Sequence, residues 1–329
     1  DSVYIDRLSR IPAIMEMPYN DIIRKFIDMY AGRLRNQVSF MLSACNFYMP
    51  IFEEALDAYG LPLELRYLPI IESALNPSAV SRAGASGLWQ FMIGTGKIYG
   101  LESNSLVDER RDPIKATWAA ARYLKEMYDI YGDWNLVIAA YNCGPGTINK
   151  AIRRANGETD YWKIYNYLPK ETRGYVPAFI AANYVMTYYC DHNICPMETN
   201  IPASTDTVQV NKNLHFEQIA DLCNVPLDQI KSLNPQYKKQ MIPGDSKPYT
   251  LRLPIDAIST FIDKQDTIYA HRADELFRNR KTVAVKEITP STRKTTTAVA
   301  GKGKLTYYTI KSGDTLSTIA GKYGVTIKD

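Results

Sequence analysis

Glu72 is the residue of this sequence best suited to acid–base chemistry, because its neighbours are apolar. It lies in the run LRYLPIIESAL, among Leu68, Ile70, Ile71 and Leu75. Apolar surroundings disfavour the charged carboxylate and raise its pKa, so that the group can hold a proton near neutral pH. Such a group can donate a proton to a glycosidic oxygen. From this position alone, an exposed Glu at a helix end stays an open alternative.

The residues after Glu72 supply hydroxyl and amide groups where an ordinary glycosidase would need a second carboxylate. No acid lies between Glu72 and Glu102, and the intervening loop offers Ser81, Ser86 and Gln90. Two-carboxylate glycosidases hold their acids about 5–5.5 Å or 6.5–9.5 Å apart, whereas substrate-assisted families do without the second acid. We therefore favour a single-carboxylate mechanism. Glu171 could still act as the second carboxylate, so hydrolysis stays an alternative.

Histidine and cysteine are too sparse to hold a metal or a disulfide framework. The chain has 3 His and 5 Cys at irregular spacings, so we expect no metal and no cofactor. Cys190 and Cys195 enclose four residues, and three states stay open for them: a disulfide, a weak metal site with His192, or two free thiols. Cys143 is expected to behave as a small buried hydrophobe.

Residues 1–200 have the pattern of a helical domain. Asn20 can cap a 3.6-residue apolar period that runs from Ile22 to Leu42. Asp112-Pro113 and Gly132 mark the start and end of another helix. Further helices are expected around residues 50–59, 63–75, 134–142, 145–155 and 172–190. No apolar run approaches the roughly 20 residues of a membrane span. The chain starts without Met or an apolar signal core, so we expect that an export signal has been removed.

The C-terminal part contains an internal repeat. The segment VQVNKNLHFEQIADLCNV from Val208 aligns without gaps with YTIKSGDTLSTIAGKYGV from Tyr308. Each copy is typical of a strand, a turn and a small amphipathic helix, and the first copy continues into a second helix and a closing strand. Between the copies, residues 271–304 carry nine Lys or Arg against three acids and thin into PSTRKTTTAVAGKGK. This composition favours a flexible linker, and the lack of interleaved aromatics argues against nucleic-acid binding.

Four boxes in the first domain resemble the lytic transglycosylases that share the goose-type lysozyme fold. They are the Glu72-Ser73 pair, Gly-Leu-Trp-Gln at residues 87–90, Ala-Tyr-Asn at 140–142 and Glu-Thr-Arg-Gly-Tyr-Val at 171–176. The repeats resemble the LysM module, a βααβ domain that binds N-acetylglucosamine-containing glycans. The second copy keeps the typical opening YTIKSGDTLSTIA, whereas the first has residues 211–215, NKNLH, at the turn. The whole arrangement is similar to the D-type membrane-bound murein transglycosylases.

The resemblance implies a mainly α fold, in which a lysozyme-like helical domain precedes small βααβ modules. We expect the transglycosylase domain, with an N-terminal helical arm, over residues 1–203 and a degenerate LysM-like module over 204–255. A basic linker is expected over 256–304 and a truncated second LysM module over 305–329.

The resemblance also implies site roles. Glu72 would be the catalytic residue, protonating the glycosidic oxygen and then taking a proton from the muramoyl C6 hydroxyl. Ser81 would bond the muramoyl N-acetyl group and Glu171 would orient the site. The remaining substrate-binding positions would be Ser73, Gln90, Met92, Tyr141, Asn142 and Tyr175. Trp89, where the family often has Met, would add a stacking face for the sugar.

The function implied is lytic cleavage of the β-1,4 bond between N-acetylmuramic acid and N-acetylglucosamine, leaving 1,6-anhydromuramoyl ends, while the LysM modules bind the glycan. A hydrolytic muramidase and a catalytically silent peptidoglycan-binding scaffold stay as alternatives. The partner would be the peptidoglycan glycan strand, with no nucleic acid. We expect a monomeric, exported bacterial protein of the periplasm, anchored to the outer membrane by a lipid at an N-terminus that this chain lacks.

Overall fold

A computed structural model describes residues 1–202 and 204–278, and it is mainly helical. The predicted fold class is confirmed: helices dominate residues 1–192, and short strands occur in the LysM-like region. Residues 279–304 of the predicted linker and the predicted second LysM module at 305–329 lie outside the described residues. The first part contains α1 Ser2–Ser9, α2 Asp21–Ala31, α3 Arg35–Ala58, η1 Leu63–Tyr67, α4 Leu68–Ser73, α5 Ile93–Ile98, η2 Glu109–Arg111, α6 Pro113–Tyr131, α7 Trp134–Cys143, α8 Pro145–Arg154, α9 Tyr161–Ile164, η3 Tyr165–Tyr167, α10 Lys170–Thr187 and η4 Tyr189–His192.

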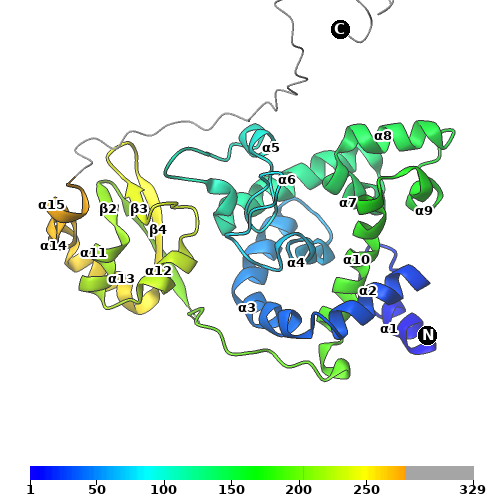
Figure 1. Cartoon of the computed structure of the whole chain (residues 1–329), viewed down its shortest axis with the longest axis horizontal. Helices are drawn as coiled ribbons and strands as arrows, with labels where there is room; N and C mark the ends of the chain where they lie inside the picture. Colours follow the sequence, from blue (N-terminus) through cyan, green and yellow to red (C-terminus); the bar gives the residue numbers. More distant parts are fainter. Residues whose placement is uncertain (203, 279–329) are drawn as a thin grey trace, which may run out of the picture. The chain divides into compact units, whose positions relative to one another are not determined.

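The short helix α4 occupies the middle of this helical part, with α3, α6 and α10 around it (Figure 1). One hydrophobic core joins these elements and also takes in α2 and α7. The helix α10 runs through that core, where Phe179, Ile180 and Tyr184 are completely buried. A short helix held on several sides by longer ones gives a fixed platform for the side chains in its last turn.

The end signals predict α6 correctly. The Asp112 side chain accepts hydrogen bonds from the backbone N–H groups of Ile114 and Lys115, and Gly132 ends the helix in the left-handed conformation at φ +62°. Both are the roles that these residue types favour at helix ends.

In residues 21–58, the sequence predicts the break between helices at the wrong place. The apolar period from Ile22 to Leu42 predicts one continuous helix, but the chain turns at Gly32 between α2 and α3. Helix α3 then continues through residues 43–49, where a gap was expected, and includes Pro50. The period persists across the turn because both helices bury the same kind of apolar face in one core, with Ile27 on α2 and Val38 on α3 fully buried.

A proline interrupts the hydrogen-bond ladder of α10. Pro177 has no N–H, so it cannot donate to the carbonyl group of Arg173 four residues earlier. The hydroxyl group of Tyr161 donates to that carbonyl oxygen at 2.9 Å instead. Because Tyr161 belongs to α9, this bond ties α9 to the middle of α10.

The LysM-like region forms a compact module with its own core. Its elements are β1 Thr205–Val210, β2 Asn213–His215, α11 Phe216–Cys223, α12 Leu227–Leu233, β3 Met241–Pro243 and β4 Tyr249–Pro254. Strand β1 pairs antiparallel with β4, from Thr205 opposite Pro254 to Val210 opposite Tyr249, and β2 pairs antiparallel with β3. The expected strand, two helices and closing strand are all present, and the short β2–β3 pair is an addition.

Three further helices follow β4 where the sequence predicts a linker. They are α13 Ile255–Asp263, α14 Gln265–Ala270 and α15 Ala273–Leu276. Phe261 and Ile268 are buried in the core of the module. The predicted linker start at residue 256 is therefore wrong, because the apolar side chains of residues 255–270 are spaced to reach that core. We propose that the module extends to about the end of α15.

Two smaller features bear on the earlier expectations. Within the part of the chain that the structure describes, no helix is both long enough and apolar enough to cross a membrane. Cys190 and Cys195 are exposed and are not bonded to each other.

Candidate active site

Glu72 stands in the last turn of α4, where the backbone geometry fixes it. Pro69 lies in the first turn, where its missing N–H would be unpaired in any case. The helix ends at Ala74 and Leu75, which have φ values of +51° and +58°. Their N–H groups bond back to the carbonyl groups of Ile70 and Pro69 at 3.0 and 3.3 Å. This closure turns the chain away directly after Ser73 and leaves the Glu72 side chain at the helix end.

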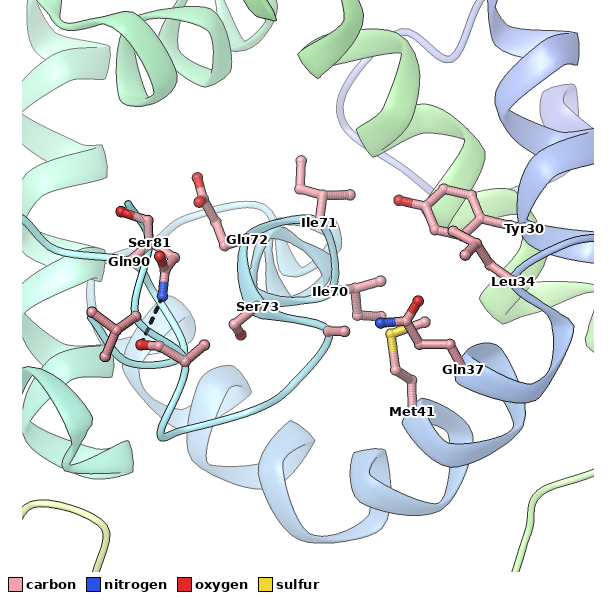
Figure 2. Close-up of a pocket in the computed structure, with 13 residues that line it drawn as sticks. Tyr30, Leu34, Gln37, Met41, Ile70, Ile71, Glu72, Ser73, Ser81 and Gln90 are labelled. Atoms are coloured by element: carbon pink, nitrogen blue, oxygen red, sulfur yellow. Dashed lines mark hydrogen bonds between the residues drawn. The ribbon is translucent and has the colours of Figure 1, made fainter. Parts of the chain in front are cut away.

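A pocket of about 420 Å³ opens over this helix end. Figure 2 shows the Glu72 carboxyl group between the Ser81–Gln90 side of the pocket and the Tyr30 side. Helices α2, α3 and α4 and the loop at residues 79–90 contribute the lining, namely Tyr30, Leu34, Gln37, Met41, Ile70, Ile71, Glu72, Ser73, Ala74, Ala79, Val80, Ser81 and Gln90. Glu72 is the one acidic residue in this lining. The wall is therefore mixed apolar and neutral polar around a single carboxyl group.

The surroundings of Glu72 favour its protonated form. Burial, as the largest influence, raises the pKa of the Glu72 carboxyl group to about 7. The hydroxyl group of Tyr175, on α10, donates a hydrogen bond to Glu72 Oε1 and opposes that rise. The nearby charge of Glu171 adds to it. The group therefore exchanges its proton close to neutral pH, as an acid that later serves as a base must do.

The loop at residues 79–91 presents Ser81 and Gln90 to the pocket. The Ser81 hydroxyl group accepts a hydrogen bond from the Ala85 N–H at 3.0 Å. The Gln90 side-chain amide donates to the carbonyl groups of Ala79 and Gly87 at 3.2 and 2.8 Å, and the first of these bonds is drawn in Figure 2. Gln90 has a φ of +48°, an uncommon value for a residue other than glycine. Such strain is held by the surrounding structure and occurs often at functional sites.

Ser73 lines the pocket, but its hydroxyl group is engaged with the backbone. It lies 3.0 Å from the carbonyl oxygens of both Pro69 and Leu88. These contacts tie the end of α4 to the loop at residues 79–91. They support a positioning role for Ser73.

Tyr141 and Asn142, at the end of α7, are not among the residues that line the Glu72 pocket, but they bond the elements that carry it. The Tyr141 hydroxyl group donates to the carbonyl oxygen of Trp89 at 2.7 Å. Burial and then the charge of Glu72 raise the pKa of Tyr141 well above its usual range. The Asn142 amide oxygen accepts a hydrogen bond from the Thr172 hydroxyl group at 2.9 Å, which links α7 to α10.

Two residues expected at the sugar are placed elsewhere. Trp89 has an exposed fraction of 0%, and its indole N–H donates to the hydroxyl group of Thr117 at 2.9 Å. It packs edge-on against Phe52 in the core, so the predicted stacking face is wrong. Met92 is 45% exposed, and it is not among the residues that line the Glu72 pocket. Glu171 is also exposed and reaches the site through its charge alone.

The structure adds Tyr30, Gln37 and Met41 to the site. Tyr30 belongs to the apolar period of the first helical run, so its spacing predicts only that it faces the core. No motif in the sequence separates these three positions from ordinary packing residues. Their role becomes visible when α2 and α3 are placed opposite α4.

The chemistry available at this site is proton transfer and hydrogen bonding. Among the described residues, no group of His, Cys, Asp or Glu side chains could hold a metal ion. A carboxyl group that titrates near neutrality can donate a proton to a leaving oxygen and take one back. The neutral groups around it can bond the hydroxyl and N-acetyl groups of a sugar.

The sequence matches three families of domains. Residues 49–164 match the transglycosylase SLT domain, residues 204–270 the LysM-like domain of lytic transglycosylase MltD, and residues 308–329 the LysM domain. The SLT match contains Glu72, Ser81, Gln90 and Tyr141. The match at 204–270 includes α13 and α14, in agreement with a module that continues beyond β4.

Two curated relatives agree with these matches. The membrane-bound lytic murein transglycosylase D of Escherichia coli is 32% identical over 96% of this chain, and the chain spans 66% of that protein's length. The soluble lytic murein transglycosylase of Escherichia coli is 33% identical over 36% of this chain and 19% of its own. The crystal structure of the 70 kDa soluble lytic transglycosylase of Escherichia coli aligns with 44% of this chain and 24% of its own at a TM-score of 0.38 and 29% identity.

The order of the matched domains and the nearly full-length similarity to the D-type protein agree with the motif boxes around Glu72, and the chain belongs to the lytic transglycosylase family.

Proposed function

We propose that this protein is a peptidoglycan lytic transglycosylase that cleaves the β-1,4 bond between N-acetylmuramic acid and N-acetylglucosamine and leaves 1,6-anhydromuramoyl ends. The observation that carries the proposal is the state of Glu72, the single acid in its pocket, with a pKa raised to about 7 by burial. One carboxyl group of this kind can act first as acid and then as base. The names of the relatives support murein as the substrate.

In the proposed reaction, Glu72 protonates the glycosidic oxygen as the bond to the muramoyl C1 breaks. The resulting carboxylate then takes the proton of the muramoyl C6 hydroxyl group, whose oxygen bonds to C1 and closes the anhydro ring. No water is consumed in these steps. The N-acetyl oxygen of the substrate can stabilise the positive charge in between, which suits a pocket without a second carboxylate.

The remaining site residues bind or orient the substrate in this proposal. Ser81 and Gln90 lie on the pocket wall beside Glu72, where they can bond the N-acetyl and hydroxyl groups of the sugar. Tyr175 holds the Glu72 carboxyl group through its hydrogen bond. Tyr141 bonds the loop that carries Gln90, and Asn142 links α7 to α10. Glu171 acts on Glu72 through its charge, and Ser73 positions the loop.

The LysM-like modules would bind the glycan strand and raise its concentration near the pocket. The D-type relative is called membrane-bound, which supports a membrane-associated location. We further propose a periplasmic monomer that a lipid attaches to the outer membrane.

The test is the product set of the Glu72→Gln variant on purified sacculi. We expect release of anhydromuropeptides to fall by about 10²- to 10⁴-fold, because the variant lacks the proton donor. Sacculus binding should be retained. Glu54→Gln on the exposed face of α3 is the matched control and should have wild-type activity.

Mass spectrometry of the wild-type products separates the alternatives. Anhydromuramoyl ends support the proposal, whereas reducing muramoyl ends support a hydrolytic muramidase. Glu171→Gln should leave the anhydro product unchanged. Binding without either product supports a silent scaffold.

A further inference from the structure

A segment of the helical part is built into the core of the LysM-like module. We name residues 102–109, which follow α5 and end at the first residue of η2, the docking segment. Its Leu106 and Val107 are 4% and 0% exposed and pack in the same hydrophobic cluster as Phe216, Tyr237 and Leu251 of the module. Because these two side chains are fully buried, they form part of the hydrophobic core of the LysM-like module and do not merely touch its surface.

Backbone hydrogen bonds fix the docking segment to the module. Val107 and Tyr237 form an antiparallel bridge. The Asp108 N–H donates to the Gln236 carbonyl oxygen at 2.8 Å, and the Lys238 N–H donates to the Leu106 carbonyl oxygen at 2.8 Å. The segment is therefore held in one register.

Side chains add to this attachment. The Lys238 ammonium group donates to the carbonyl oxygen of Asn104 at 2.8 Å and lies 3.9 Å from Asp108 Oδ2. Lys247 pairs with Glu102, and the Tyr249 hydroxyl group donates to the same carboxylate at 3.0 Å. Both ends of the docking segment thus bond to the module.

The docking segment leads directly into Arg110, which holds the loop at residues 79–91. Arg110 forms a buried bidentate salt bridge with Asp108, in which Nε donates at 2.9 Å and Nη2 at 2.8 Å. Its Nη1 donates to the carbonyl oxygens of Gly84 and Phe91 at 2.8 and 2.9 Å. A guanidinium group can make these bonds together because its donors have a fixed planar arrangement.

The loop held in this way is the one that presents Ser81 and Gln90 to the pocket. Arg110 bonds it near the turn at Gly84 and again at Phe91, next to Gln90. A continuous chain of contacts therefore runs from the module core through Val107 and Asp108 to Arg110 and the substrate-binding loop.

We propose that the LysM-like module is a positioning element of the catalytic pocket, acting through the docking segment and Arg110 as the positioning residue. The inference rests on the proposed function, and it adds a role for the module that is separate from glycan binding. Loss of the attachment loosens Ser81 and Gln90, whereas Glu72 stays fixed on α4. The KM for a glycan fragment then rises, and kcat is nearly unchanged.

The test measures KM and kcat of the chain on a soluble fragment of two disaccharide repeats. For so short a fragment, a second tethered binding site contributes little. Val107→Asp places a charge in the module core and detaches the segment. We expect its KM to rise by about 10-fold, because loosened hydrogen bonds to the sugar weaken binding and each typical bond contributes about a factor of ten or less.

Lys238→Met is the second variant, for the case in which Val107→Asp does not fold. It removes the bond to Asn104 while keeping a side chain of similar length, and its KM should rise in the same direction. Val107→Ile should retain the wild-type KM. Lys239→Met, at the exposed neighbouring lysine, is the matched control and should retain the wild-type KM.

The outcomes separate this proposal from the proposed function. If wild-type protein forms no anhydro product from sacculi or fragment, the proposed function is wrong. If the wild type is active and Lys238→Met keeps its KM on the fragment, the positioning role is wrong while the function stands. A fall in kcat with KM unchanged also contradicts the proposal, because it reports a smaller folded fraction.

Discussion

The hydrogen bond between Tyr175 and Glu72 both orients the carboxyl group and sets its acidity. Burial favours the neutral acid, whereas a donor to the carboxylate favours the charged form. The pKa of about 7 is the balance of these opposing effects. A stronger donor would make the acid too weakly protonated at neutral pH, and its absence would make the later base step harder.

Tyr175→Phe should therefore change the pH dependence of the reaction. The protonated form of Glu72 carries out the first step, so we expect kcat/KM of the wild type to fall as pH rises through about 7. The variant lacks the bond that lowers the pKa, and its descending limb should shift to higher pH. Rates of anhydromuropeptide release between pH 5 and 9 measure the shift.

Tyr30→Phe is the matched control, because Tyr30 lines the pocket without a hydrogen bond to Glu72. The descending limb of its kcat/KM against pH should stay at the wild-type pH. A Tyr175→Phe limb at the wild-type pH or below would show that the tyrosine does not tune Glu72.

At the scale of elements, the backbone of the loop at residues 79–91 packs closely against the backbone of η2 at Gly87. Gly87 has a φ of +88°, and a Cβ atom there would lie 1.8 Å from the carbonyl oxygen of Arg110. Gly84 has nearly the same φ, +89°, yet a Cβ atom there would meet nothing within 4 Å. Both positions therefore need the positive φ that glycine favours, but only Gly87 also lacks room for a side chain.

Gly87→Ala should lower both stability and activity. Gly84→Ala should lower the free energy of unfolding by about 1–2 kcal/mol, the cost of a left-handed conformation for alanine. Gly87→Ala should cost more, because backbone must also move, and it should displace Gln90. Chemical denaturation and anhydromuropeptide release measure the two effects. Equal values for the two variants would contradict this description of the loop.

The sequence predicts elements well where a local signal marks an end. Asp112 and Gly132 delimit α6 because capping and a left-handed residue act over a few neighbours. Gly32 also follows a helix end, as glycine often does, but the apolar period that continues through it hides the break. Glu72, Ser81 and Gln90 line one pocket, while the roles expected of them stay predictions. The burial of Trp89 and the position of Tyr30 in the Glu72 pocket depend on packing between distant parts of the chain. The spacing of residues along the sequence does not encode such packing.

At the scale of the whole molecule, the first residues of the predicted linker contribute to folding. The helices α13 and α14 complete the core of the module with Ala257, Phe261 and Ile268. A net charge counted over a window of sequence cannot separate such buried positions from the charged ones between them. The extent of a domain is therefore better read from apolar spacing than from composition.

Phe261→Ala should destabilise the module strongly. Phe261 is 1% exposed, and removal of a buried aromatic ring typically lowers the free energy of unfolding by about 3–5 kcal/mol. Ile262→Ala is the matched control, since Ile262 is 58% exposed and surface changes are usually within about 0.5 kcal/mol. Urea denaturation followed by circular dichroism gives both values. Similar values would place α13 outside the module core.

The contact between Tyr161 and the Arg173 carbonyl group has a consequence for how this protein can vary. The hydroxyl group stands in for the N–H that Pro177 lacks. With any other residue at 177 the N–H returns, and the carbonyl oxygen no longer needs the tyrosine. Positions 161 and 177, on two different helices, therefore constrain each other: while the proline is present, loss of the Tyr161 hydroxyl group leaves the Arg173 carbonyl group without this hydrogen bond.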